Sequence, residues 1–214
     1  METKKKNRKQ LLIEAACEVF SQKGYRDATI ADICERAESN IASVNYYFGD
    51  KEHLYAQVWK YAFEESLKAY PPEGDLPSNA PATERLKARI GSLMNRILDD
   101  GKVGYFSRML FTEMANPTDS IDEVIKKTVM PQKEQFFDIL SKLLGEAATK
   151  ENVCLCAVCV MNTCIMFSMH NHMRKKILVP KDGMNITREM LIEHIYTFAM
   201  GGIEECRKKY LEGK

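Results

Sequence analysis

Hydrophobic positions recur along the chain at spacings of three and four residues, which is the period of an amphipathic α-helix. In the first such segment, residues 9–23, one face carries Leu12, Ala15, Ala16, Val19 and Phe20. Gly24 follows this segment, and glycine is the residue that adopts a left-handed helix cap without strain. The pattern therefore predicts a first helix that ends at Gly24.

The helical spacing continues to the end of the chain, and the sequence shows no strand-like alternation of useful length. Helices are predicted after caps at Thr29, Asn40 and Asp50, the last of them reaching Tyr70. Further helices are predicted over residues 82–98, 103–114, 119–144, 151–177 and 187–211. Pro131 should interrupt or kink the helix over residues 119–144, because proline donates no backbone hydrogen bond. The predicted fold class is all-α.

Residues 29–51 contain two short helices joined by a brief turn, followed by the start of a third. Asp32 stands three residues after Thr29, in an arrangement similar to a capping box. Val44 and Phe48 are the inward positions of the second short helix. Two short helices joined in this way indicate a helix-turn-helix, whose second helix enters the major groove of DNA.

The composition is that of a globular protein whose first residues are basic. The chain has 214 residues, of which 45% are hydrophobic and 29% charged, and its net charge is only +1. This balance is typical of globular proteins and does not itself indicate a nucleic-acid partner. The first ten residues, however, contain Lys4, Lys5, Lys6, Arg8 and Lys9. A basic arm of this kind suits contact with phosphates or the minor groove, and a solvated, disordered start is the alternative for the first lysines.

The sequence indicates a cytoplasmic protein without a membrane span. Glu14 and Glu18 interrupt the apolar stretch after the basic start, so no signal peptide is predicted. The most apolar segment, residues 153–169, contains Asn162 and is better explained as a buried helix than as a membrane span. Seven cysteines, an odd number, fit reduced thiols.

Residues 12–54 resemble the DNA-binding domain of the tetracycline-repressor (TetR) family of bacterial regulators. The matching positions are Leu12, Ile13, Ala15, Ala16, Val19, Phe20, Gly24, Tyr25, Thr29, Ile30, Ile33, Arg36, Ala37, Val44, Tyr47, Phe48, Lys51 and Leu54. Family members usually have glycine directly after the equivalent of Ala37 and an apolar residue next, where this chain has Glu38 and Ser39. A positive φ at Glu38 would cost about 1 kcal/mol, so we expect an altered turn and an intact motif.

The resemblance implies two domains. Residues 1–52 would form a three-helix DNA-binding domain that contains the helix-turn-helix. Residues 53–214 would form a helical domain for effector binding and dimerisation, with a proline-rich linker at residues 71–81. The predicted partners are double-stranded DNA with a palindromic operator, a second copy of the chain, and a small effector of unknown identity.

The resemblance also implies which side chains contact DNA. The expected phosphate contacts are Thr29, Ser43, Tyr47 and Lys51. The expected base-facing residues are Ile41, Ala42, Asn45 and Tyr46. An asparagine can form two hydrogen bonds with adenine, and small apolar side chains can touch the methyl group of thymine. Packing on the domain is the alternative role for Tyr46 and Tyr47.

The last two predicted helices are the candidates for the dimer interface, because Gly201 and Gly202 would permit close approach of two backbones. Aromatic and methionine side chains between the linker and the end of the chain are candidates for an effector pocket, and ordinary core packing is the alternative. The predicted lining is Tyr105, Phe106, Met109, Phe137, Met161, Cys164 and Phe167.

Two other classes of function are weighed against this interpretation. A redox- or metal-responsive regulator would use the cluster Cys154, Cys156, Cys159 and Cys164 with the nearby His170 and His172, although buried cysteines also behave as small hydrophobes. A helical enzyme would need a nucleophile and base or a phosphate loop, and Glu113, Asp119 and the histidines form neither. We therefore predict a ligand-responsive repressor that a small apolar effector releases from DNA, with no catalytic residue, metal or cofactor.

Overall fold

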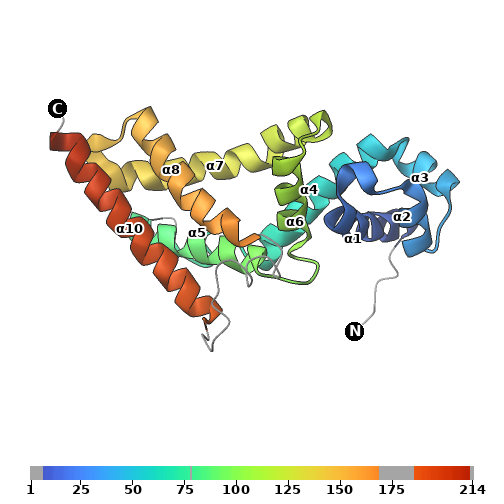
Figure 1. Cartoon of the computed structure of the whole chain (residues 1–214), viewed down its shortest axis with the longest axis horizontal. Coiled ribbons are helices and arrows are strands. Elements are labelled where there is room, and N and C mark those ends of the chain that lie inside the picture. Colours follow the sequence, from blue (N-terminus) through green and yellow to red (C-terminus); the bar gives the residue numbers. More distant parts are fainter. Residues whose placement is uncertain (1–6, 78, 169–185, 213–214) are drawn as a thin grey trace. The chain divides into compact units, whose positions relative to one another are not determined.

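The computed structural model describes residues 7–77, 79–168 and 186–212, and none of these residues forms a β-strand. Along the chain the elements are α1 (Arg8–Asp27), α2 (Ile30–Arg36), α3 (Ile41–Phe48), α4 (Lys51–Ala69), α5 (Ala82–Ile97), α6 (Tyr105–Ala115), the 3-10 turn η1 (Asp119–Ile121), α7 (Asp122–Leu144), η2 (Gly145–Ala147), α8 (Lys150–Ile165), η3 (Met166–Ser168) and α10 (Arg188–Glu212) (Figure 1). The predicted all-α fold is confirmed.

The chain divides into two compact units. The first combines Met1–Ala69 with Asp99–Val129, and the second combines Tyr70–Leu98 with Met130–Lys214. The first unit therefore contains α1 to α4, α6 and the start of α7, and the second contains α5, the rest of α7, α8 and α10. These units reflect packing, whereas the division at residue 52 concerns function and stays a prediction.

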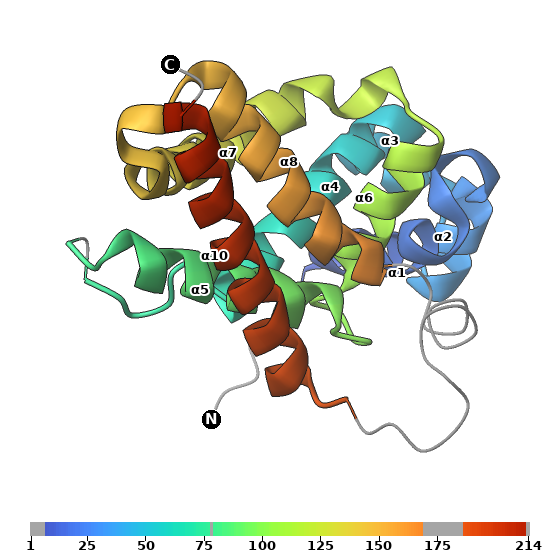
Figure 2. The same cartoon turned by 60° about the vertical axis from the view of Figure 1, so that its left-hand side comes forward.

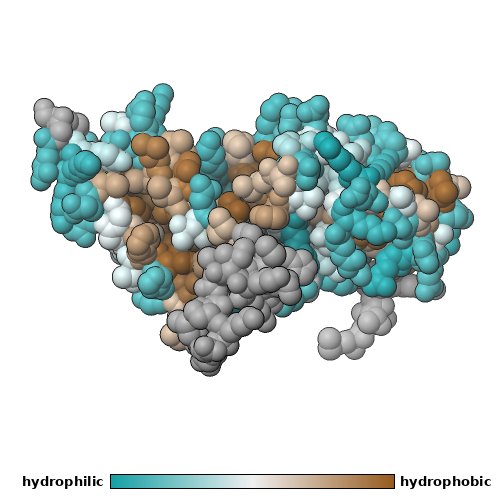
Figure 3. Space-filling model, viewed as in Figure 1, coloured by the Kyte–Doolittle hydropathy of each residue, from teal (hydrophilic) through white to brown (hydrophobic). Residues whose placement is uncertain are grey.

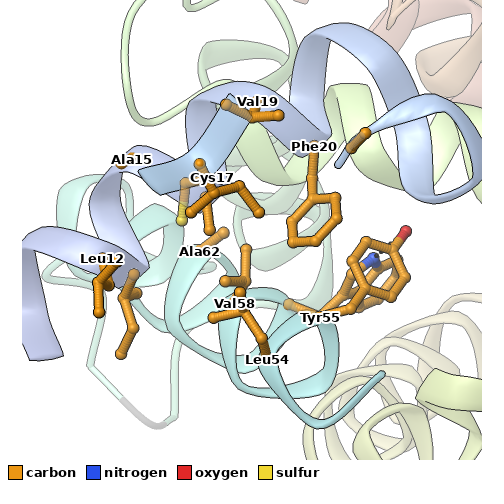
Figure 4. Close-up of a cluster of buried hydrophobic side chains, with 14 of the residues drawn as sticks. Leu12, Ala15, Cys17, Val19, Phe20, Leu54, Tyr55, Val58 and Ala62 are labelled. Carbon is orange, nitrogen blue, oxygen red and sulfur yellow. Dashed lines mark hydrogen bonds between the residues drawn. The ribbon is translucent and has the colours of Figure 1, made fainter. Parts of the chain in front are cut away.

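The core of the first unit forms where α1 packs against α4 and α6. Large side chains from α1 and α4 meet there, among them Leu12, Phe20, Leu54 and Tyr55 (Figure 4). These four and Trp59 of α4 are each 0% exposed. The ring centroids of Phe20 and Tyr55 are 4.8 Å apart with their planes at 68°, an edge-to-face contact of the kind that stabilises aromatic cores. This core supports the short helices α2 and α3.

Gly24 closes the regular part of α1, as its position predicted. Its φ is +72°, inside an element that continues as a further turn to Asp27. A Cβ atom at this position would lie 2.7 Å from Cγ2 of Thr112 on α6. Only glycine therefore satisfies both the backbone conformation and the close approach of α6.

The predicted caps of the next three helices are confirmed. Thr29 and Asp32 form a reciprocal capping box at the start of α2. The side chain of Asn40 accepts a hydrogen bond from the backbone of Ser43 at 2.9 Å, and that of Asp50 accepts one from the backbone of His53 at 2.8 Å. These bonds satisfy amides that have no partner within a helix.

The second unit has its own hydrophobic core, which shares no residue with the first. Its buried members come from α5, α7, α8 and α10: Leu86, Ile90, Met94, Phe136, Ile139, Leu140, Leu144, Val153, Cys156, Ala157, Val160, Cys164, Ile195 and Ile203. α10 packs against both α5 and α8 (Figure 2). The second unit is thus a helical bundle with a continuous apolar interior.

Two predictions for the later helices need correction. α7 is not interrupted at Pro131, because it continues through this residue as one helix of 23 residues; a kink at Pro131 stays a prediction. Pro131 is exposed, so solvent can satisfy the carbonyl group that lacks its helical donor. α8 ends at Ile165 and is followed by η3, which is earlier than the predicted end at residue 177; residues 169–177 of that prediction lie outside the described residues.

Candidate nucleic-acid interface

The turn between α2 and α3 has the strained backbone that its sequence suggested. Glu38 has a φ of +48° and is the one non-glycine residue with positive φ among those described. The hydroxyl oxygen of Ser39 is buried and has no hydrogen-bond partner in the described part of the chain. α2 and α3 nevertheless both form, so the expected intact motif is confirmed, whereas the expected alteration of the turn stays a prediction.

Replacing Glu38 with glycine should raise the free energy of unfolding by about 1 kcal/mol, because glycine adopts this conformation without a Cβ clash. Urea or thermal unfolding of the purified protein measures the change. The matched control is Glu35→Gly on the exposed side of α2, where glycine should lower the free energy of unfolding by about 1 kcal/mol. If both variants were destabilised equally, the strain assigned to Glu38 would be absent.

The two faces of α3 differ in the way a recognition helix requires. Val44 and Phe48 are 0% and 6% exposed and belong to the core of the first unit. Four residues on the remaining surface are exposed: Ile41, Ala42, Asn45 and Tyr46. These four are the residues predicted to face bases, and the structure brings them together on one short helix.

Tyr46 and Tyr47 have different surroundings. Tyr46 is 83% exposed, the largest value among the exposed large hydrophobic residues described. Tyr47 is half-buried, packs against the core of the first unit, and has its ring 6.2 Å from that of Phe48. Packing on the domain, the alternative role, thus applies to part of the Tyr47 side chain. It does not explain why the Tyr46 side chain is exposed.

Three of the four predicted phosphate contacts lie at or near helix N-termini. The Thr29 hydroxyl accepts a hydrogen bond from the backbone of Asp32 at 3.1 Å and keeps its own proton to donate. The Ser43 hydroxyl donates to Asn40 Oδ1 at 3.0 Å. Backbone amides and the helix dipole at these ends favour an anion. The role of both hydroxyl groups stays a prediction.

Lys51 is held more firmly than a free surface lysine. Its ammonium group lies 4.6 Å from the centre of the Tyr25 ring, and it donates to the backbone carbonyl of Arg26 at 3.4 Å. Partial burial lowers the pKa of Lys51, and the nearby Asp27 opposes this shift. The contact with the ring restricts where the cation can reach, which is a way to fix its position beside a phosphate.

Two ion pairs hold α2 against α1, and neither was predicted from the sequence. The guanidinium group of Arg36 binds both carboxylate oxygens of Glu18, with distances of 2.7 to 2.9 Å. Lys23 lies 2.9 Å from Asp32, and hydrogen bonds from Lys23 and then Thr29 lower the pKa of Asp32 to about 2. The bidentate arginine contact is the more directional of the two.

The start of α1 also lies near the recognition helix. The Lys9 ammonium is 5.6 Å from the centre of the Phe48 ring. Arg8 is exposed one residue earlier. The predicted basic arm continues to lysines 4–6, which lie outside the described residues.

A buried carboxylate connects α6 with α4. Glu113 is 7% exposed and accepts hydrogen bonds from the Tyr55 hydroxyl at 2.8 Å and from the backbone and hydroxyl of Thr118 at 2.9 and 3.0 Å. Trp59 Nε1 donates to the Tyr55 hydroxyl at 3.2 Å. Burial, followed by the bond to Glu113, raises the pKa of Tyr55. These bonds give Glu113 a structural explanation, and His170 and His172 of the enzyme alternative lie outside the described residues.

The residues predicted to line an effector pocket fall into two groups. Phe106 and Met109 are buried in the first core, and Tyr105 packs against it. Cys164 is buried in the second core, against which Phe137, Met161 and Phe167 pack. Each group lies in one unit, and the role of both groups stays a prediction.

The cysteines of the sensing alternative do not share one environment. Cys154 and Cys159 are exposed on α8, whereas Cys156 and Cys164 are buried. Burial raises the pKa of Cys164 to about 12 and is the main cause that raises that of Cys156 to about 11. A raised pKa disfavours the reactive thiolate. Among the described residues, no group of three or more acidic, histidine or cysteine side chains is placed to hold a metal ion.

An apolar groove runs between α8 and α10 of the second unit. It is lined by Leu155, Cys156, Cys159, Val160, Thr163, Ile195, Phe198, Ala199, Gly202, Ile203, Cys206 and Tyr210. Leu155 is 57% and Phe198 72% exposed, and Figure 3 shows hydrophobic residues gathered over these helices. Neighbouring apolar exposure of this kind marks an interaction surface. Within the described part of the chain, no helix is both long and apolar enough to cross a membrane.

Comparison with protein families gives two matches. The family model described as bacterial regulatory proteins, tetR family, matches residues 12–58. The model of the C-terminal domain of the HTH-type transcriptional dual regulator CecR matches residues 82–203. The first match covers the predicted helix-turn-helix, and the second covers more than half of the chain.

Curated relatives are similar over part of their length. The dual regulator CecR of Shigella flexneri is 25% identical over 154 residues, which span 68% of each chain. The uncharacterized HTH-type transcriptional regulator YuxN of Bacillus subtilis is 24% identical over 71% of this chain, and the match spans only 50% of that relative. This chain thus covers about half the length of one of its relatives.

Solved structures share the fold. A TetR-like transcriptional regulator from Rhodococcus sp. RHA1 has a TM-score of 0.66 and 18% identity, over 92% of this chain and 96% of the other. The transcriptional regulator FadR from Bacillus subtilis, solved in complex with stearoyl-CoA, has a TM-score of 0.67 and 16% identity, over 90% and 98%. At these identities the likeness establishes the architecture.

Proposed function

The chain belongs to the TetR family of bacterial transcriptional regulators, and from this premise we propose that it represses transcription as a homodimer on a palindromic operator. The observation that carries the proposal is the exposed surface of α3, where Ile41, Ala42, Asn45 and Tyr46 project from a helix whose other side is anchored in the core. One such helix is too short to read many bases, so two copies related by a twofold axis are needed for useful affinity.

The proposed division of labour follows the helices. Residues 1–52 bind DNA through the base-facing side chains of α3 and through Thr29, Ser43, Tyr47 and Lys51 on phosphates. Residues 53–214 bind the effector and form the dimer. The apolar groove of α8 and α10, with Phe198 and Leu155 at its surface, supports these helices as the interface, because burial of such side chains drives association.

The proposed effector is a small molecule with an apolar body that binds among the helices of the C-terminal part. Stearoyl-CoA in the FadR neighbour makes acyl chains the first compounds to test. Binding would shift α4, which follows α3 after only Gly49 and Asp50, and so disfavour the operator-bound form. An effector does this only if it binds the two forms with different affinities.

Selection of bound DNA from a random pool, using the purified full chain, tests the proposal directly. The expected product is a palindrome whose binding weakens steeply with salt, because Lys and Arg contacts release counterions. Selected DNA is then titrated with protein in the presence of acyl-CoA thioesters and other apolar compounds. A pool that yields no sequence preference would contradict the DNA-binding function.

Replacing Asn45 with alanine should lower affinity for the selected operator by roughly 1–3 kcal/mol while leaving non-specific binding unchanged. The physical reason is the loss of two hydrogen bonds to one base edge. Fluorescence anisotropy with the operator and with a scrambled duplex measures both quantities.

Lys51→Ala is the matched contrast to this variant. Its loss should be similar on every duplex and should lower the slope of affinity against salt by about one unit. Unchanged affinity and selectivity in Asn45→Ala would show that Asn45 does not read a base.

A further inference from the structure

Helix α5 carries three arginines, and two of them are fully engaged in the second unit. Arg85 Nε lies 2.6 Å from Glu73 Oε2, and Nη1 lies 3.2 Å from Asp138 Oδ2. Arg89 Nε lies 3.0 Å from Glu73 Oε1, and Nη2 donates to Gln135 Oε1 at 2.6 Å. Glu73 therefore anchors the linker to α5 through both arginines.

Arg96, the third, has no such partner. Arg96 as a residue is half-buried, and its guanidinium donates a hydrogen bond from Nε to the carbonyl of Ser92 in the same helix, at 3.3 Å. Among residues 7–77, 79–168 and 186–212, no carboxylate lies within 4.0 Å of it. Burial, and then the nearby Arg89, lower the pKa of Arg96 to about 10.

The arginines of α5 outnumber the carboxylates that pair with them. Among the described residues, Glu73 and Asp138 pair with Arg85 and Arg89 but not with Arg96, and Asp138 is shared with the ammonium of Lys142 at 2.8 Å. A charge removed from water without a counter-ion is costly. A guanidinium group in this state attracts an anion, and its planar fork matches the two oxygens of a carboxylate or phosphate.

Two residues close to Arg96 along α5 are apolar. Leu93 and Ile97 on α5 are half-buried and pack against the second core. α5 contacts α8 and η3, and Met161 and Phe167 of those elements are also half-buried against that core. α5 thus carries an uncompensated cation close to residues that pack against an apolar core, and a cation beside apolar surface is the chemistry that binds an anionic amphiphile.

We propose that Arg96 binds the anionic head group, a carboxylate or phosphate, of an amphiphilic effector whose apolar body packs against the neighbouring core of the second unit. This rests on the proposed function only in taking the ligand to be the effector. The proposal narrows the effector from a molecule with an apolar body to one that also carries an acidic end.

The test compares ligands of equal chain length on the full-length protein. The probes are decanoate and hexadecanoate, the alkyl phosphates of the same lengths, and the corresponding primary alcohols. In the wild-type protein the acids should bind about ten- to a hundredfold more tightly than the alcohols, as expected for charge-assisted hydrogen bonds. Arg96→Met should abolish this difference, and Arg96→Lys should retain part of it, because lysine keeps the charge without the fork.

Thermal unfolding without ligand separates an anion site from a structural arginine. Methionine replaces the stem of Arg96 with apolar volume and removes the unpaired charge, so the Tm of Arg96→Met should equal or exceed that of the wild type. Arg207→Met, at an exposed position of α10, is the matched control and should retain the preference for acids. If Arg96 instead pairs with another part of the chain, Arg96→Met will have a lower Tm, and the proposal is overturned.

Two further results would also overturn it: equal binding of acids and alcohols by the wild-type protein, or no binding of any acid in the series. Release of operator DNA is measured on the same samples. An acid that binds through Arg96 without changing operator affinity would refute the effector role in the proposed function and leave the Arg96 site standing.

Discussion

Replacing Phe198 with aspartate should convert the protein to a monomer that no longer holds its operator. Phe198 is 72% exposed on α10 beside the groove shared with α8. In a twofold dimer the substitution occurs twice, and losing the burial of two phenyl groups at roughly 2 kcal/mol each weakens association by about a thousandfold. Two carboxylates placed in an apolar interface add a further penalty. Light scattering after gel filtration and operator binding measure the two effects.

The control for this variant is Thr197→Asp, which adds the same charge at an exposed neighbour that does not line the groove. It should remain dimeric and bind the operator. Asn45→Ala should likewise remain dimeric, because its change lies on α3. A Phe198→Asp protein that stays dimeric at micromolar concentration would show that the interface lies elsewhere.

The parts of the fold that sequence could predict are those set by near neighbours. Thr29, Asn40 and Asp50 cap helices through bonds that span three residues, so their spacing is visible in the sequence. The strain at Glu38 was likewise predictable, because the missing glycine is a local departure from the family pattern. The inward positions of α3 follow from helical periodicity alone.

Contacts between distant segments were beyond the sequence. The Glu18–Arg36 pair and the Tyr55–Glu113 bond join residues 18 and 58 positions apart, and helical periodicity does not say which helices will be neighbours. The same limit explains the predicted pocket residues. The helical spacing of hydrophobic residues predicted that Phe106 and Phe137 would be at least partly buried. It did not indicate that these two residues belong to different units.

The exposed residues of the candidate site could be predicted from the sequence, whereas the contacts that hold the site in place could not. The exposure of Asn45 and Tyr46 follows from the spacing of Val44 and Phe48 on α3. The position of Lys51 against the Tyr25 ring depends on where α1 ends relative to the start of α4, which is a tertiary property. The same distinction applies to Arg96. Its position on α5 could be predicted from the helical pattern, whereas its lack of a carboxylate partner depends on which segments the fold places around it.

Glu113→Ala should lower the free energy of unfolding by about 3 kcal/mol. The substitution leaves the buried hydroxyl of Tyr55 and the backbone amide of Thr118 without their acceptor, and each unsatisfied group costs about 1–3 kcal/mol, with a further loss from the small cavity. Urea denaturation followed by tryptophan fluorescence is a suitable measurement, because Trp59 donates to the Tyr55 hydroxyl within the same network.

A double-mutant cycle with Tyr55→Phe identifies the bond itself. Tyr55→Phe alone should cost less than Glu113→Ala, since Thr118 keeps its acceptor, and the double variant should lose less than the sum of the two. Glu64→Ala, an exposed position on α4 whose nearest ion pair is 3.9 Å long, should change stability by less than about 0.5 kcal/mol. Strict additivity of the two single variants would mean that the 2.8 Å contact contributes no coupling energy. Tyr55 lies on α4, the helix that follows α3. A measurable coupling energy between Tyr55 and Glu113 would therefore mean that the Glu113 network helps to fix the position of α4, which supports the DNA-binding surface.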